Sequence, residues 1–250
     1  DYSSLRYFFY GASPIAPEKL RMALETFGPV MCQVYGQTET AMPTTCLTPA
    51  DHYADGEIAS DKRLSSCGRQ SPFSRVEIMD EARSILPPGQ VGEIAVRSHG
   101  VMLGYYKSPE QTKDVLVDGW LLTGDLGYMD EDGFFYIVDR KRDIIISGGF
   151  NVYSLEVERA LLAHPAVQEC AVIGVPDERW GEAVKAIVQL KPSAACEAAD
   201  LIAFCKEQIG SLKAPKSVDF VAGLPRSAVG KVLKRELKKK YWEGRDKMVS

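Results

Sequence analysis

The chain has 250 residues, 45% of them apolar, which is enough to bury the core of one large domain or two ordinary ones. A net charge of −4 argues against a general nucleic-acid binder, and no apolar run approaches the roughly 20 residues of a transmembrane helix. The six cysteines show neither CxxC pairs nor the spacing of a zinc site or secreted scaffold, which favours a reduced, cytoplasmic protein.

The amino-terminal part has the pattern of a β-loop-α-β unit. The apolar run from Leu5 to Tyr10 predicts a strand, Pro17 falls in the first turn of a helix, and Val30 to Tyr35 predicts a second buried strand. Since a strand begins so soon after a first residue that is not Met, we expect the chain to be part of a longer polypeptide. The stretch from Thr44 to Lys62 has little periodicity and is interpreted as a long surface excursion.

Further along the chain, the pattern of apolar, polar and turn residues changes twice. Short β-rich segments separated by turns predict a small, mostly antiparallel β-subdomain over about residues 66–139; they are Arg75–Met79, Gly92–Arg97 and Phe134–Val138. After Asp139 the pattern predicts a compact α+β domain with a helix from Leu155 to Ala163. Its other expected elements are strands near Ile144, Val172 and Val188 and helices near Phe204 and Leu237.

The predicted fold class is therefore α/β and α+β. We expect residues 1–139 to be the end of a large αβ domain with its β-subdomain, and residues 140–250 to be a small α+β domain. The charged junction Asp139–Asp143 is consistent with a solvated linker, and the basic segment Lys231–Lys240 with a surface helix.

Three motifs carry groups suited to nucleotide chemistry. Tyr35–Glu39 follows a predicted strand, at the end where open α/β sheets bind ligands, although such a pentapeptide can equally be a structural turn. Asp125 follows a short apolar segment, and a carboxylate accepts two hydrogen bonds from vicinal ribose hydroxyls. The loop Pro225–Lys231 presents a lysine, but it fails the P-loop pattern because Pro225 and Val232 occupy the glycine and hydroxyl positions.

In their order and spacing, these motifs resemble the AMP-forming, adenylate-forming superfamily of acyl-CoA synthetases, peptide-synthetase adenylation domains and beetle luciferases. The resemblance covers essentially the whole chain. The matching segments are Gly11-Ala12-Ser13, Tyr35–Glu39, Gly92-Glu93, Gly119–Asp125, Asp139–Gly149 and Gly230-Lys231. It implies a ligase that activates a carboxylic acid with MgATP to an acyl-adenylate and then transfers the acyl group to CoA.

The resemblance also implies roles for individual residues. Tyr35 would stack on adenine, Asp125 with Arg140 would bind the ribose, Thr38 would contact phosphate, and Glu39 would hold Mg²⁺. The remaining residues expected to line the nucleotide site are Gly11, Ala12, Ser13, Gly36 and Gln37.

The other implied roles concern the second half of the chain. Lys231 would be the catalytic cation beside the α-phosphate. The small domain would then rotate about Arg142 and present Gly148 and Gly149 to the pantetheine of CoA.

The chain departs from the family pattern at several positions. Arg142 stands where Asp or Lys is most common, Ser227 where Thr is frequent, and Ser13 where Ala is frequent. The Ser/Thr/Gly-rich loop that grips the β- and γ-phosphates should lie upstream of Asp1. We therefore expect the amino-terminal half of the parent enzyme to be a partner, and the chain alone to have little or no activity.

Several alternatives stay open. The acid is expected to be fatty or aromatic, luciferase-like oxidation is a rarer alternative, and a homodimer is open. A different class of function is a non-catalytic nucleotide-binding or interaction module. The histidines at 52, 99 and 164 are interpreted as surface or capping residues rather than ligands, and Cys205 as part of a helical core face with Leu201 and Ile209.

Overall fold

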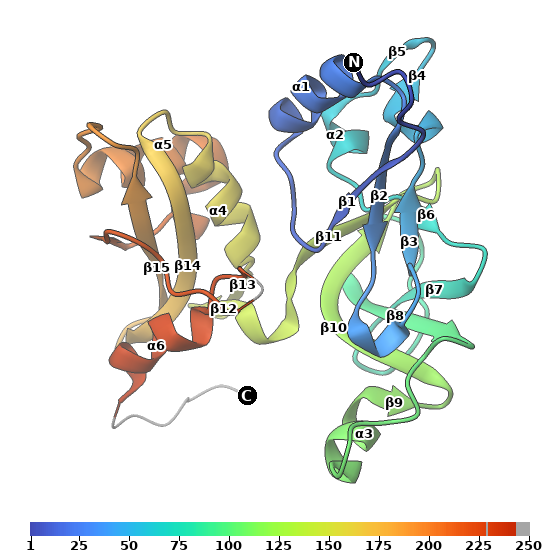
Figure 1. Cartoon of the computed structure of the whole chain (residues 1–250). Helices are drawn as coiled ribbons and strands as arrows, with labels where there is room; N and C mark the ends of the chain where they lie inside the picture. Colours follow the sequence, from blue (N-terminus) through green and yellow to red (C-terminus); the bar gives the residue numbers. More distant parts are fainter. Residues whose placement is uncertain (229, 244–250) are drawn as a thin grey trace. The chain divides into compact units, whose positions relative to one another are not determined.

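The computed structural model describes residues 1–228 and 230–243, so Val229 of the lysine loop lies outside the described residues. The chain forms two compact units, Asp1–Val138 and Asp139–Ser250. Each unit combines helices with its own sheets (Figure 1), and the predicted α/β and α+β fold class is confirmed. Within the described part of the chain, no helix is both long and apolar enough to cross a bilayer.

The first unit begins with the predicted β-loop-α-β unit. Strand β1 (Phe8–Gly11) lies parallel to β2 (Met31–Tyr35), and helix α1 (Pro17–Phe27) connects them. Leu20 and Leu24 of α1 pack on Met31 of β2, because residues four apart share one helix face. The apolar stretch before Phe8 does not extend the strand, so β1 is shorter than predicted at its start.

The stretch 44–62 is not simply a surface excursion, and that prediction is wrong. It contains β3 (Thr45–Leu47), which pairs antiparallel with β2 and continues the sheet in the order β1-β2-β3-β6. Its buried side chains, which include Leu47, His52 and Ala59, anchor it to the unit. A three-residue strand is too short for alternation to be visible, which explains the missing signal.

Short elements complete this part of the unit. They are the single 3-10 turns η1 (Thr38–Thr40) and η2 (Ala50–His52), the strands β4 (Tyr53–Ala54), β5 (Glu57–Ile58) and β6 (Arg69–Gln70), and helix α2 (Asp61–Leu64). Leu64 of α2 is buried with Leu20 and Leu24 of α1, so both helices belong to one core.

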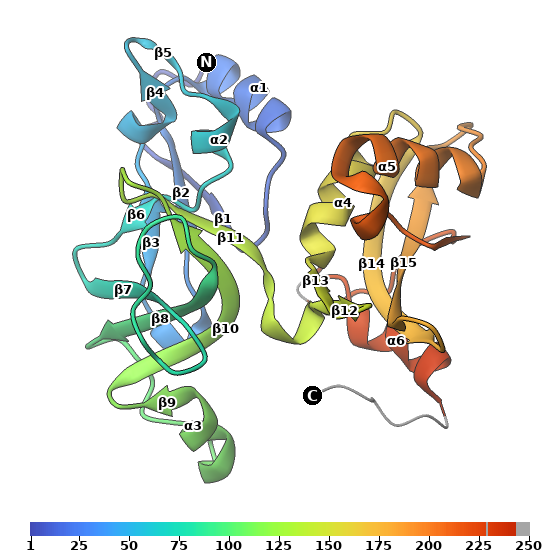
Figure 2. The same cartoon turned by 180° about the vertical axis from the view of Figure 1, so that it is seen from behind.

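The predicted antiparallel β-subdomain forms the second sheet of the unit, in the order β11-β10-β8-β7 with β9 paired to β10 (Figure 2). Its elements are β7 (Ser74–Met79), β8 (Gly92–Ser98), α3 (Pro109–Val115), β9 (Leu116–Val117), β10 (Trp120–Met129) and β11 (Phe135–Arg140). Alternate residues along its strands, such as Val76 and Ile78 of β7 and Ile94 and Val96 of β8, form its core, as period-two patterning requires.

The second unit is built on a long hairpin of β14 and β15, flanked by three other strands and covered on both faces by helices (Figures 1 and 2). Its elements are η3 (Lys141–Asp143), β12 (Ile145–Ser147), β13 (Phe150–Val152), α4 (Ser154–Leu162), β14 (Val167–Asp177), β15 (Gly181–Leu190), α5 (Ala198–Lys213), β16 (Ser217–Phe220) and α6 (Lys234–Trp242).

The two faces of this sheet carry different cores. Helices α4 and α5 cover one core through Leu161, Leu201 and Cys205, while Leu237 of α6 packs on the opposite core. The predicted core position of Cys205 is confirmed, and burial raises the pKa of its thiol to about 11. The basic segment does form a helix, as predicted, but its apolar side chains pack inward.

Candidate functional site

In the first unit, Asp125 contacts Tyr35 and Gln37, although about 90 residues separate it from them along the chain. The Tyr35 hydroxyl donates to Asp125 Oδ2 at 2.8 Å, and Gln37 Nε2 donates to the same oxygen at 2.9 Å. Burial, followed by the charge and hydrogen bond of Asp125, raises the pKa of Tyr35 well above its ordinary value, so the phenol stays protonated. These bonds fix the orientation of a carboxylate that is only 5% exposed.

A β-bulge aims Asp125 toward this contact. The register of β10 against β8 shifts between Leu122 and Leu126, which releases the intervening residues from the ladder. Gly124 adopts a φ of +71°, and its N–H donates to Glu93 Oε1 at 3.0 Å in place of a ladder bond. Glu93, for which the sequence suggested no role, therefore supports the bulge that positions Asp125.

Glu39 lies in η1, directly after the strand that carries Tyr35. Its Oε1 accepts a hydrogen bond from the Tyr105 hydroxyl at 2.9 Å, and its backbone carbonyl accepts from the Met102 N–H at 2.7 Å. Residues 100–105 therefore brace the turn, while the neighbouring Thr38 is exposed. No described group of three or more His, Cys, Asp or Glu side chains is arranged to hold a metal ion. Glu39 thus fits Mg²⁺ only as one carboxylate ligand among phosphates and waters, which is how Mg²⁺ is commonly bound.

Gly11 ends β1, Ala12 and Ser13 follow it, and Gly36 follows β2, so both segments lie at the carboxyl edge of a parallel strand pair. A Cβ at Gly11 would stand 2.2 Å from the Val34 carbonyl oxygen, which requires glycine there. Ala12 has a φ of +64°, in the left-handed region that is uncommon for alanine. The turn after β1 is therefore tightly constrained.

In the second unit, Lys231 ends a compact loop before α6. The Ser227 N–H donates to the Lys231 carbonyl at 2.8 Å, and the Lys231 N–H donates to Ser227 Oγ at 3.2 Å. The Lys231 side chain is exposed and makes no ion pair with residues 1–228 or 230–243. An ammonium group is thus presented to solvent on a hydrogen-bonded loop.

Gly148 and Gly149 form the two-residue turn between β12 and β13, in which Ser147 pairs with Phe150. Both glycines have positive φ, 59° and 81°, as a tight hairpin turn requires. A Cβ on Gly148 would stand 2.5 Å from the Trp180 ring, whereas Gly149 has open space there. Glycine at 148 is therefore already required by the turn and its packing.

The predicted site residues fall into two groups, one in each unit. Residues Gly11 to Ser13, Tyr35 to Glu39 and Asp125 belong to the first unit. Arg140 at the end of β11, the exposed Arg142 in η3, the two glycines and Lys231 belong to the second.

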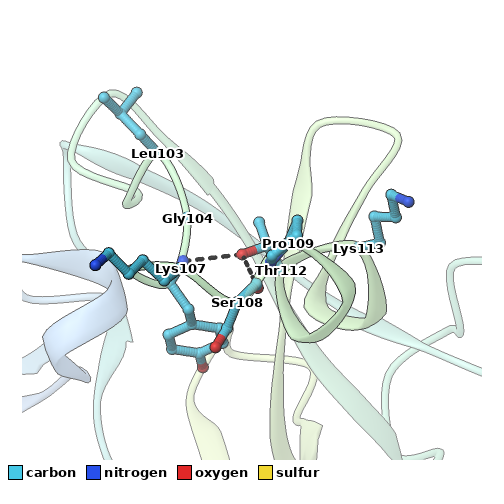
Figure 3. A pocket seen from close by; sticks show the side chains of 8 residues that line it. Leu103, Gly104, Lys107, Ser108, Pro109, Thr112 and Lys113 are labelled. Carbon is cyan, nitrogen blue, oxygen red and sulfur yellow. Dashed lines mark hydrogen bonds between the residues drawn. The ribbon is translucent and has the colours of Figure 1, made fainter.

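A pocket is lined by residues between 103 and 113, none of which is a predicted site residue. Leu103, Lys107 and Thr112 line it, and the Tyr105 N–H donates to Thr112 Oγ1 at 2.9 Å (Figure 3). This hollow is open to solvent, and one continuous segment around α3 supplies its lining.

His52 is completely buried, so its interpretation as a surface or capping residue is wrong. Its Nε2 lies 2.8 Å from the Tyr10 hydroxyl, and its Nδ1 lies 2.7 Å from the Thr48 carbonyl oxygen. Burial lowers its pKa, which favours the neutral ring. The sequence could not predict this, because the histidine sits in a segment without periodicity.

Two models of known protein families match this chain. The model described as AMP-binding enzyme matches residues 1–106, and the model for the AMP-binding enzyme C-terminal domain matches residues 156–231. The first match falls in the first unit and the second match in the second unit, and together they take in well over half of the chain. The chain belongs to the AMP-binding enzyme family. The resemblance noted from its motifs is thereby confirmed.

Several AMP-binding enzymes align with almost the whole chain. A medium/long-chain fatty acid–CoA ligase of Mycobacterium tuberculosis is 44% identical, with 100% of this chain and 44% of that protein covered. A feruloyl-CoA synthase of an Amycolatopsis species is 39% identical, covering 96% and 47%. The solved structure of the amide bond synthetase McbA from Marinactinospora thermotolerans has a TM-score of 0.86 at 42% identity, covering 96% and 48%. The chain spans about half the length of the relatives it matches.

Proposed function

We propose that the polypeptide containing this chain activates a carboxylic acid with ATP to an acyl-adenylate and then transfers the acyl group to CoA. The observation that carries the proposal is the meeting of Tyr35, Gln37 and Asp125 around one buried carboxylate oxygen. A scaffold does not need a buried, doubly hydrogen-bonded carboxylate at a β-bulge, because burying a charge is costly. A nucleotide-binding enzyme uses such a fixed acceptor for ribose hydroxyls.

In this proposal the first unit binds the nucleotide. Tyr35 offers a ring face to adenine, Asp125 accepts hydrogen bonds from the ribose hydroxyls, and Arg140 of the second unit assists. Thr38 contacts phosphate, and Glu39, oriented by Tyr105, would hold Mg²⁺. Mg²⁺ would supply charge neutralisation when bound. The segment Gly11 to Ser13, together with Gly36, lets the backbone approach the ligand closely.

The second unit supplies the cation and the acceptor contacts. The ammonium of Lys231 would stabilise the charge that develops on the α-phosphate as the acid carboxylate attacks and pyrophosphate leaves. Gly149, which has open space beside its Cα, is better placed for the pantetheine than Gly148, which Trp180 covers. Rotation of residues 140–250 about Arg142 would alternate these two groups at one site.

We further propose that residues 1–139 complete a large domain whose remainder is the amino-terminal half of a parent enzyme. Tyr7, just before the edge strand β1, and Phe9, within it, are 59% and 63% exposed, and their ring centroids lie 5.9 Å apart in a stacked arrangement. Exposed aromatic pairs of this kind favour coverage by further polypeptide. That half would supply the loop that binds the β- and γ-phosphates and much of the acid pocket, so the chain alone should have little activity. We propose that the parent enzyme is cytoplasmic.

The acid is proposed to be fatty or aromatic. The supporting relatives are named for medium- and long-chain fatty acids and for ferulic acid, and their alignments cover nearly all of this chain. CoA is the proposed acceptor, although one relative is a fatty acid–carrier protein ligase and one solved neighbour is an amide bond synthetase.

The test is pyrophosphate release and acyl-product formation by the full-length polypeptide. MgATP is combined with a panel of fatty and aromatic acids, and CoA, a carrier protein and an amine are compared as acceptors. We expect acid-dependent pyrophosphate release, CoA thioester formation, and a loss of adenylation in Lys231→Ala of about 100-fold or more. Lys239→Ala, on the exposed side of α6, is the matched control. Nucleotide binding without turnover would favour the non-catalytic module instead.

A further inference from the structure

Lys234, three residues after Lys231, enters a largely buried polar network at the first residue of α6. Its Nζ lies 2.7 Å from Glu158 Oε1 and donates to Ser154 Oγ at 2.6 Å, both residues of α4. The Lys234 and Glu158 side chains are 16% and 12% exposed. One ammonium thus joins the beginning of α6 to two successive turns of α4.

The network continues to the first residue of the second unit. Ser154 Oγ donates to Asp139 Oδ1 at 3.0 Å, and the Ser154 N–H donates to Asp139 Oδ2. Glu158 Oε1 also accepts from the Val172 N–H at 2.8 Å, which ties α4 to β14. Burial raises the pKa of both carboxyl groups, and Lys234 opposes that shift in each. Lys234 is therefore the cation that makes this pair of carboxylates tolerable.

A second anchor holds the other end of the Lys231 loop. Arg226 forms an ion pair with Glu169 of β14, and its guanidinium also donates to the Gly230 carbonyl at 2.5 Å. Arg226 and Val232 form an antiparallel bridge, which closes the base of the loop. Lys231 therefore stands between a tether at Arg226 and a tether at Lys234.

From this geometry we infer that Lys234 is a positioning residue that fixes the Lys231 backbone, so that the ammonium of Lys231 is presented in one orientation to the acyl-adenylate-forming site. The inference rests on the proposed role of Lys231. A lysine side chain has four rotatable methylenes, so its tip can be aimed only if its Cα is fixed. The two anchors hold that Cα from both sides, and the backbone bridge between Arg226 and Val232 closes the loop between them.

The kinetic test uses the full-length polypeptide. We expect Lys234→Met to lower the kcat of adenylation by about 10- to 100-fold while the KM for ATP changes by less than about threefold, because misplacement of a catalytic group mainly affects the transition state. Lys234→Arg should restore most of the rate. The exposed Lys239→Met on the same helix is the control. Acyl transfer from supplied acyl-adenylate to CoA should stay within about threefold, since the α-phosphate has already reacted.

A second measurement does not depend on turnover. The amide hydrogens of Ser227, Lys231 and Leu233 all bond within the loop, so their exchange reports whether it is held. We expect exchange at least about tenfold faster in Lys234→Met than in the control. If wild-type protein forms no adenylate, the proposed function fails, and exchange still decides whether Lys234 holds the loop.

A double variant guards against a folding defect. Glu158→Leu combined with Lys234→Met removes both charges of the Lys234–Glu158 ion pair, while Asp139 keeps its hydrogen bonds from the Ser154 N–H and Oγ. We expect this variant to fold and still show the low adenylation kcat. Wild-type kcat in the double variant, or wild-type exchange in Lys234→Met, would overturn the inference.

Discussion

Replacing Tyr35 with Phe separates two roles of one side chain. The hydroxyl donates to the charged acceptor Asp125 at 2.8 Å, and such a bond contributes about 1.5–3 kcal/mol to stability. In the wild type, Gln37 donates to the same oxygen at 2.9 Å, and it can still do so in the variant. We therefore expect the free energy of unfolding to fall by an amount near the lower end of this range, about 1.5 kcal/mol. Urea unfolding of the first unit measures it, with Tyr128→Phe, on the strand β10 that carries Asp125, as a control.

Nucleotide binding should respond differently, because the ring is kept. We expect the Kd for AMP in Tyr35→Phe to rise by less than about threefold, corresponding to less than about 0.7 kcal/mol. Tyr35→Ala removes the stacking face, worth about 1–3 kcal/mol per base, and should raise the Kd by about 5- to 150-fold. Titration calorimetry of the full-length polypeptide compares the two. An equal increase in the Kd for AMP in both variants would refute the stacking argument and would show that AMP is recognised through the Tyr35 hydroxyl.

Two further predictions concern stability. Gly148→Ala should destabilise the second unit more than Gly149→Ala. Each substitution places alanine at positive φ, which costs about 1–2 kcal/mol, but only the alanine at 148 also meets the Trp180 ring. Equal midpoints in chemical unfolding would contradict this. Because burial lowers the pKa of His52, the unfolded state binds more protons below the ordinary histidine pKa of about 6.5, so stability should fall as pH drops through it. His52→Phe should flatten that slope between pH 7.5 and 5.5.

Local patterns in the sequence were sufficient for much of the fold. Pro17 marked the first residue of α1, because its fixed φ and missing N–H suit a helix start. Period-two segments located the antiparallel sheet of the first unit, and helical spacing placed Cys205 in a core. The family followed from motifs in a fixed order, each of which is local in the chain.

The candidate site depended on contacts that no local pattern records. Tyr35–Glu39 could be placed after a strand, but only the bulge in β10 decided that Asp125 meets Tyr35 and Gln37. Likewise, β3 and His52 were hidden in a stretch without periodicity.

The sequence by itself therefore determined the family, the order of most elements and the chemical groups available to the site. The tertiary structure decided which of those groups meet, and it revealed the supporting residues Glu93, Tyr105 and Lys234. The reason is physical: helix and strand patterns arise from neighbours a few residues apart, whereas a hydrogen bond across 90 residues depends on strand register, bulges and packing.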